Sequence, residues 1–375
     1  MKQELIDYII KNGKDLSWAE LAAKFNLATG EIARHIWRKY KADQQGLQLK
    51  SRWQANTKDG VVWMESYKAT NNEANRLNFA EIIEAIQPKQ FNIRGVATDK
   101  QHIGLYYLAD EHIGADVKDG LYDTSYDEHV FKHRLETIYN KIVRHAEVYG
   151  TFKHLIIGNL GDSIDGYNAQ TTRGGHILPQ NLDIKRVFNI YVEAHMNFLY
   201  SLLQAGVSEN LYYVGVSESN HGGDIEYICH KGLEYAMKQT DVKFCVMENF
   251  MDHFIIGNHC FIFTHGKDKN DRKRNMPLNL TQDVENFIKQ YIDINGLGAY
   301  TISVIKGDLH QSASQTGKFF RYRNTASIFG SSKWSMINFG YTPPACDYDI
   351  TVDDEIIEGR IILDSTIKTN AKFTI

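Results

Sequence analysis

Five short polar segments each follow a hydrophobic run and carry side chains that commonly bind metal ions. They combine carboxylates, imidazoles and one amide. In chain order the segments are Asp110-Glu111-His112, Gly161-Asp162-Ser163-Ile164-Asp165, Asn220-His221-Gly222, Thr264-His265-Gly266 and Gly307-Asp308-Leu309-His310. One segment alone would be an ordinary turn at the end of a strand. Five together can supply the ligands of two adjacent metal ions, an arrangement that cleaves phosphate esters.

The ligand types narrow the choice of metal and of reaction. Imidazole favours transition metals and carboxylate favours harder ions, so the mixture fits manganese, iron or zinc better than calcium. The sequence shows no serine or cysteine nucleophile motif. We therefore expect direct hydrolysis by water that two divalent ions activate, without a covalent enzyme intermediate.

The hydrophobic runs that precede the five segments have the length and composition of buried strands. Helical stretches are expected between several of them, at 128–149 and 184–204. Alternating strands and helices predict an α/β fold, in which functional groups gather at the carboxyl ends of the strands.

The composition is that of a globular protein. Hydrophobic residues make up 43% of the 375 residues and charged residues 23%. The net charge of −4 gives no overall reason to expect nucleic-acid binding, so local charge must carry that argument. The four cysteines form no CxxC pair, which argues against a zinc knuckle or a disulfide framework and favours the cytoplasm, or the host cytoplasm for a phage protein. No signal peptide or membrane span is expected, and hence no membrane partner.

The first 52 residues are basic, with ten Lys and Arg against six Asp and Glu. Ser17 is expected to begin a helix, with Glu20 at the capping-box position. The stretch SWAELAAKFNLATGEIARHIWRKYK resembles a helix-turn-helix module, whose last helix would present Arg34 and Arg38 to nucleic acid. A small helical bundle with a solvated charged face is the equal alternative.

The order of the five segments, written D-x-H, G-D-x-x-D, N-H, H and G-x-x-H, resembles that of the calcineurin-like metallophosphoesterase superfamily. The resemblance covers roughly residues 102–310 and is nearest to Mre11/SbcD-like nucleases of phage type. It implies an α/β/β/α sandwich of two sheets. We expect a helix-turn-helix-like domain at 1–52, a linker with partial structure at 53–100 and the metallophosphoesterase domain at 101–375.

The resemblance also implies a role for each matching residue. Asp162 would bridge the two ions, because one carboxylate can span a separation of about 3.5–4 Å. His221 would be the general acid that protonates the leaving oxygen, and Asp165 would orient His221. The other implied ligands are Asp110, His112 and His310 for the first ion, and Asn220 and His265 for the second.

The sequence departs from the family pattern at two places. The third motif usually reads G-N-H-D/E, but Ser219 and Gly222 flank the Asn-His pair here, so Asp224 or Glu226 would have to replace the missing carboxylate. The last motif is usually G-H-x-H, and Asp308 stands at its first histidine. Asp308 as an oxygen ligand of the second ion favours Mn²⁺ as the cofactor, with Mg²⁺, Fe²⁺ and Zn²⁺ as alternatives.

Three basic segments are candidates for substrate contacts, each with a solvated loop or strand as the alternative reading. The segment GYNAQTTRGGHILPQ offers Arg173 and His176, GKDKNDRKRN offers Lys267, Arg272 and Arg274, and KFFRYRN offers Arg321. A nuclease acting on DNA or RNA is therefore the leading function. The alternatives are a phosphatase or a phosphodiesterase for cyclic nucleotides or small diesters, and an inactive DNA-binding adaptor. A homodimer and an ATPase partner, as in Mre11-type enzymes, are left open.

Overall fold

The computed structural model contains two compact units, Met1–Glu81 and Ile82–Ile375. The described residues are 2–12, 16–44, 47–57, 60–69, 97–119, 124–178, 180, 182–269, 275–331, 336, 340–352 and 355–363. Among these residues, no helix combines the length and the apolar character needed to cross a membrane.

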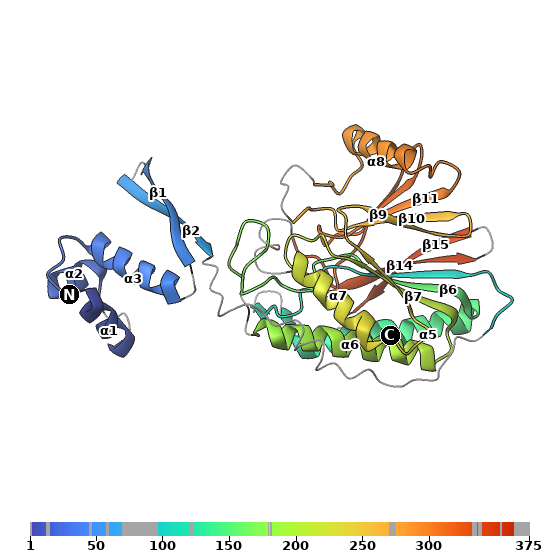
Figure 1. Ribbon diagram of the computed structural model, residues 1–375, viewed down its shortest axis with the longest axis horizontal. Helices are drawn as coiled ribbons and strands as arrows, with labels where there is room; N and C mark the ends of the chain where they lie inside the picture. Colours follow the sequence, from blue (N-terminus) through green and yellow to red (C-terminus); the bar gives the residue numbers. More distant parts are fainter. Residues whose placement is uncertain are drawn as a thin grey trace, which may run out of the picture. The chain divides into compact units, whose positions relative to one another are not determined.

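The described part of the first unit contains three helices followed by a β-hairpin (Figure 1). Its elements are α1 (Lys2–Asn12), α2 (Trp18–Lys24), α3 (Gly30–Gln44), β1 (Leu47–Thr57) and β2 (Gly60–Ala69). The expected capping box is present: the Ser17 hydroxyl accepts from the backbone N of Glu20, and the Glu20 carboxylate accepts from the backbone N of Ser17 at 2.7 Å. Leu5, Leu21 and Ala33 are fully buried between the helices. The hairpin crosses residue 52, where the sequence placed a domain boundary.

The second unit contains two β-sheets. The first sheet has the strand order β15-β14-β3-β6-β7-β8. Its strands are β3 (Ile103–Leu108), β6 (Phe152–Asn159), β7 (Ser208–Val216), β8 (Lys243–Met247), β14 (Ala345–Val352) and β15 (Glu355–Ile362). Strands β3, β6, β7 and β8 are parallel, whereas β14 is antiparallel to both of its neighbours.

The second sheet has the strand order β12-β13-β11-β10-β9. Its strands are β9 (Asp252–Ile256), β10 (His259–Thr264), β11 (Thr301–Lys306), β12 (Ala313–Thr316) and β13 (Arg321–Asn324). Strands β10, β11 and β13 are parallel, and the two outer strands are antiparallel to their neighbours. A short hairpin of β4 (Val117–Asp119) and β5 (Thr124–Tyr126) lies outside both sheets.

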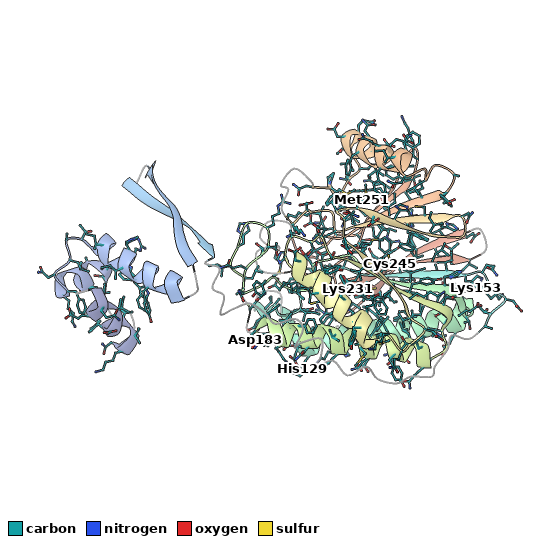
Figure 2. All side chains as sticks on the ribbon, in the orientation of Figure 1. His129, Lys153, Asp183, Lys231, Cys245 and Met251 are labelled. Atoms are coloured by element: carbon teal, nitrogen blue, oxygen red, sulfur yellow. The ribbon has the colours of Figure 1, made fainter. Side chains whose placement is uncertain are left out.

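Helices cover the outer faces of both sheets, which gives four layers (Figure 1). The helices are α5 (Glu128–Tyr149), α6 (Ile184–Gln204) and α7 (Asp224–Ala236) on the first sheet, and α8 (Gln282–Ile294) on the second. Helices α5 and α6 begin side by side: Arg186 Nη2, in the first turn of α6, lies 2.8 Å from Glu128 Oε1 at the start of α5. Figure 2 labels a residue at each of these ends, His129 on α5 and Asp183, which caps α6. The expected α/β/β/α sandwich with a small N-terminal helical domain is confirmed.

Alternate residues of the central strands enter different apolar cores. On β3, Tyr106 packs toward the helices of the first sheet, whereas Tyr107 packs between the two sheets with Phe263 of β10. A third core joins the second sheet to α8 through residues such as Ile288. All six residues of β3 are therefore buried, which explains why its sequence is a continuous apolar run rather than an alternating one.

A buried charge cluster joins the second sheet to the edge of the first. Arg323 on β13 pairs with Asp349 on β14 and donates from Nη2 to Gly359 O on β15 at 3.2 Å. The Tyr107 hydroxyl donates to the other oxygen of Asp349 at 2.7 Å. Both members of the ion pair are buried, and Asp349 also pairs with Arg321. Removing Arg323 therefore takes away one of the two arginines that compensate this buried carboxylate.

Replacing Arg323 with alanine is therefore expected to lower the free energy of unfolding by about 3–5 kcal/mol. The matched control is Arg144→Ala, which removes an exposed pair with Glu147 on α5 and should cost at most about 0.5 kcal/mol. Urea denaturation followed by circular dichroism measures both losses. Equal losses for the two variants would contradict the role given to the buried pair.

Candidate metal centre

Five strands from the two sheets end at one site. Strands β3, β6 and β7 are followed by the first three polar segments, and β10 and β11 by the other two. Neighbouring parallel strands end at the same edge of a sheet, which brings the segments together. In each of three resulting groups the ligand atoms lie within 4.8 Å of one another: Asp110, His112 and His310; Asp110, Asp162 and His265; and His112, Asp165 and His221.

The ligand segments have an unusual backbone. Five of their residues have positive φ angles: Asp110 (51°), His112 (47°), Asp162 (49°), Asp308 (73°) and His310 (56°). The left-handed region costs roughly 1–2 kcal/mol for a residue that has a Cβ, so surrounding contacts must hold it. Asp110 N donates to Gly161 O at 3.1 Å, and His112 N donates to Asp162 O at 2.9 Å. The first two segments thus lie side by side and fix each other.

The first group of ligand atoms fits a cation. Asp110 Oδ2 and His112 Nε2 are buried and have no hydrogen-bond partner among the described residues. His310 donates from Nδ1 to Gly330 O at 2.6 Å, which leaves its Nε2 facing Asp110 Oδ1, 3.6 Å away. Burial raises the pKa of Asp110 to about 7, although the nearby imidazole of His265 opposes the rise. A metal ion would satisfy these atoms, and the Nδ1 contact of His310 is the kind that orients an imidazole ligand.

His265 is surrounded by oxygen atoms. Its Nδ1 donates to Leu160 O at 2.9 Å, so Nε2 faces Asn220 Oδ1 at 3.0 Å and Asp162 Oδ2 at 3.2 Å. Burial disfavours the charged ring, but the neighbouring carboxylates, Asp162 foremost, raise the pKa of His265 to about 10. Either a proton or a metal cation must therefore lie between Nε2 and these oxygens.

Asp110 and Asp162 both occupy central positions. Asp110 belongs to two of the three groups and Asp162 to one, whereas the family resemblance implied that Asp162 is the bridging ligand. His221 N donates to Asp162 Oδ1 at 2.9 Å, which leaves Oδ2 facing His265. Although burial acts to raise it, the charges of His265 and His221 hold the pKa of Asp162 well below its ordinary value. The assignment of the bridging ligand stays a prediction.

Asp308 lies between the second group and two lysines. Its Oδ1 is 3.9 Å from His265 Nε2 and 3.4 Å from Lys267 Nζ. The buried Lys306 donates to Gly307 O at 3.1 Å, and burial lowers the pKa of Lys306 to about 8 while Asp308 acts in the opposite direction. The two lysines offset the negative charge that an aspartate brings to this position. The role of Asp308 as a metal ligand stays a prediction.

Asp165 contacts two histidines, whereas the sequence assigned it to one. Its Oδ1 is 2.9 Å from His112 Nδ1 and 3.3 Å from His221 Nδ1. The shorter contact directs His112 Nε2 toward the first group. Burial opposes protonation of His221, but Asp162 and Asp165 raise its pKa to about 9. The His221 side chain keeps 19% of its surface exposed, so it can reach a bound substrate.

Of the two acidic residues considered for the third motif, Glu226 is the one that reaches the site. It is fully buried and accepts a hydrogen bond from Ser163 N, and burial raises its pKa to about 8. A Cβ at Gly222 would meet Glu226 Cγ at 2.4 Å, so glycine there leaves room for this side chain. Asp224 instead pairs with Lys269, with Oδ1 and Nζ 2.5 Å apart, and its side chain is 85% exposed.

Two arginines expected to contact the substrate are engaged with the protein. Arg173 donates from Nη1 to Asn275 Oδ1 at 2.8 Å and to Asp268 O at 3.3 Å, and so joins two loops. Arg321 pairs with Asp349 and Glu358 in the buried charge cluster. These contacts give both arginines a structural role.

The other residues expected to contact the substrate have varied positions. Lys267 contacts Asp308, His176 is exposed, and Arg34 lies on α3 of the first unit. Arg272, Arg274 and the side chain of Arg38 lie outside the described residues. All of these substrate contacts stay predictions.

No family model and no curated protein matches the sequence. Among solved structures, a dimetal phosphatase from Danio rerio is 9% identical with a TM-score of 0.37, over 71% of this chain and 100% of that one. An archaeal phosphodiesterase is 13% identical with a TM-score of 0.31, and a phosphoesterase from E. coli is 14% identical with a TM-score of 0.29; each match covers 70% of this chain and 100% of the other. Similarity at these TM-scores carries no argument for function, which must come from the geometry of the site.

Binding of a metal ion to the metal-free protein should release protons. Because the pKa of His265 is raised to about 10, its Nε2 carries a proton at pH 7, and an ion that binds there must displace it. We expect release of at least about one proton for each chain loaded with Mn²⁺ at pH 7, and weaker binding as the pH falls. Isothermal titration calorimetry in two buffers of different ionisation enthalpy measures the release. Binding heats that do not depend on the buffer would contradict it.

Proposed function

We propose that the second unit is a metal-dependent phosphoesterase that holds two divalent cations at the candidate metal centre. The partnerless buried atoms, Asp110 Oδ2 and His112 Nε2, carry this proposal, together with His265 Nε2, which faces Asn220 Oδ1 and Asp162 Oδ2. Neither of the two partnerless atoms has a hydrogen-bond partner among the described residues. When bound, such ions activate a water molecule and neutralise the negative charge of a phosphate ester.

His221 is placed to act as the general acid. Its backbone N is fixed by Asp162, its Nδ1 faces Asp165 at 3.3 Å, and its Nε2 lies 3.9 Å from Asp162 Oδ2. A carboxylate at Nδ1 holds the ring in one orientation and favours its charged form. His221 would then protonate the leaving oxygen while Asp165 keeps the ring in place.

A nuclease is the form of this activity that we favour, with Mn²⁺ as the ion. Lys267 is 37% exposed beside Asp308, where it can contact a phosphate. The first 52 residues carry excess positive charge, and Arg34 lies on α3 within them. Positive charge of this kind adds affinity for a polyanion without reading its sequence.

A phosphomonoesterase or a small-diester phosphodiesterase is the second candidate. The observation that favours it is the engagement of Arg173 and Arg321 in contacts within the protein. Those contacts leave fewer cationic groups for a long nucleic-acid backbone.

Purified protein supplied with Mn²⁺ is expected to hydrolyse linear duplex DNA, single-stranded DNA and bis-p-nitrophenyl phosphate. Gel electrophoresis and release of p-nitrophenol measure the two kinds of activity. Turnover of the small diester alone would support the second candidate. DNA binding without any turnover would contradict an enzymatic function and favour a DNA-binding adaptor.

Replacing His221 with alanine should lower the hydrolysis rate by roughly 10²–10⁴-fold while the metal content stays near that of the unaltered protein. Elemental analysis of the purified variant measures the metal content. The matched control is His133→Ala, an exposed histidine on α5 that pairs only weakly with Glu136 and should leave both quantities unchanged. Loss of metal from the His221 variant would show that His221 is a ligand and not the general acid.

A further inference from the structure

Glu111 lies between two expected ligands, yet its own side chain contacts helix α6 and not the metal centre. Glu111 and His195 of α6 are both completely buried, with Glu111 Oε1 and His195 Nε2 3.0 Å apart. His195 donates from Nδ1 to Tyr191 O at 2.8 Å, because a carbonyl oxygen can only accept. One further proton therefore lies between His195 Nε2 and Glu111 Oε1, and a hydrogen bond joins the two side chains.

The other oxygen atoms of Glu111 are also held. Asn159, the last residue of β6, donates from Nδ2 to Glu111 Oε2 at 2.9 Å, and the Tyr126 hydroxyl donates to Glu111 O. The Asn159 side-chain oxygen in turn accepts from Gly161 N at 3.2 Å and from Ser163 Oγ at 2.7 Å. A continuous set of hydrogen bonds thus runs from α6 through Glu111 to the segment that carries Asp162.

This set of bonds acts on residues whose backbone needs support. Asp110 and His112, on either side of Glu111, both have left-handed φ angles, and a free chain would relax from that conformation. If the backbone rotated at Glu111, the side chains of Asp110 and His112 would turn away from each other. A Glu111 side chain fixed at both carboxylate oxygens prevents that rotation.

We propose that Glu111 and His195 are positioning residues for the first metal ion: they hold Asp110 Oδ2 and His112 Nε2 in place for it. Neither residue is among the ligand groups, so both act through the ligands that flank Glu111. This positioning role rests on the proposed function, since it requires that the centre binds metal. Outer contacts of this kind commonly change metal affinity by 10- to 100-fold when they are removed.

Two substitutions of His195 separate positioning from simple packing. The amide nitrogen of glutamine reaches the place of imidazole Nε2, so His195→Gln keeps a donor to Glu111. The amide nitrogen of asparagine reaches the place of Nδ1, so His195→Asn keeps the bond to Tyr191 O and loses the one to Glu111. Calorimetric titration of the full chain with Mn²⁺ measures metal affinity, and thermal unfolding of the metal-free protein measures stability.

We expect His195→Asn to weaken one of the two Mn²⁺ sites by roughly 10- to 100-fold and His195→Gln to restore most of that affinity. The matched control is Tyr106→Phe, which removes a partly buried hydrogen bond to His145 Nδ1 at 2.8 Å. Tyr106 lies on the strand that leads to Asp110. This control should lower the unfolding temperature and leave Mn²⁺ affinity unchanged. If His195→Asn does not fold, Glu111→Gln keeps the shape of the side chain, removes its charge and is expected to weaken the same site.

Suppose that the unaltered protein binds Mn²⁺ at two sites and that His195→Asn and His195→Gln have equal Mn²⁺ affinities. This result would overturn the positioning role and leave the proposed function standing. Failure of the unaltered protein to bind Mn²⁺ would overturn both. A similar loss of affinity in Tyr106→Phe would show a general effect of destabilisation, and would also overturn the positioning role.

Discussion

A buried site that collects carboxylates is stable only when positive charge compensates for them. Asp110 and Asp162 are almost completely buried in one ligand group, and Asp308 lies close to Asp110, whose Oδ1 accepts from Asp308 N at 3.2 Å. Protein cations provide part of the compensation, through Lys267 and Lys306 beside Asp308 and through His265 and His221, whose pKa values the neighbouring carboxylates raise. Asp110 Oδ2 and His112 Nε2 nevertheless have no hydrogen-bond partner among the described residues. The metal centre is arranged around these two unsatisfied ligand atoms.

The fold meets the geometric part of that need by making the ligands rigid. Each ligand segment leaves the carboxyl end of a strand that is buried between two layers, so its starting point cannot move. The two sheets must also keep a fixed relation, because one supplies Asp110 and the other His310. Apolar packing between the sheets and the ion pair of Arg323 with Asp349 maintain that relation. This rigid support holds ligand residues such as Asp110 and His112 in the left-handed backbone conformation that the site requires.

Much of the site could be predicted because its signals are local. A motif such as D-x-H after an apolar run is visible within a few residues, and strand alternation then implies an α/β fold; the division into two sheets came from the family resemblance. The hydrogen-bond partner of a side chain, by contrast, is often a residue far away in the sequence and therefore has no local signal. Glu111 and His195 are 84 residues apart, and nothing near either one indicates the contact. The same holds for the second partner of Asp165 and for the ion pairs of Arg321.

Diffraction from crystals grown with Mn²⁺, with anomalous differences recorded at the manganese edge, tests the central claim most directly. Two anomalous peaks about 3.5–4 Å apart are expected. One should lie within bonding distance of Asp110, His112 and His310, and the other within bonding distance of Asn220 and His265. The absence of any peak at this site, in crystals where His112 Nε2 and Asp110 Oδ2 bond only to water or protein, would contradict the claim that the five segments form a metal centre.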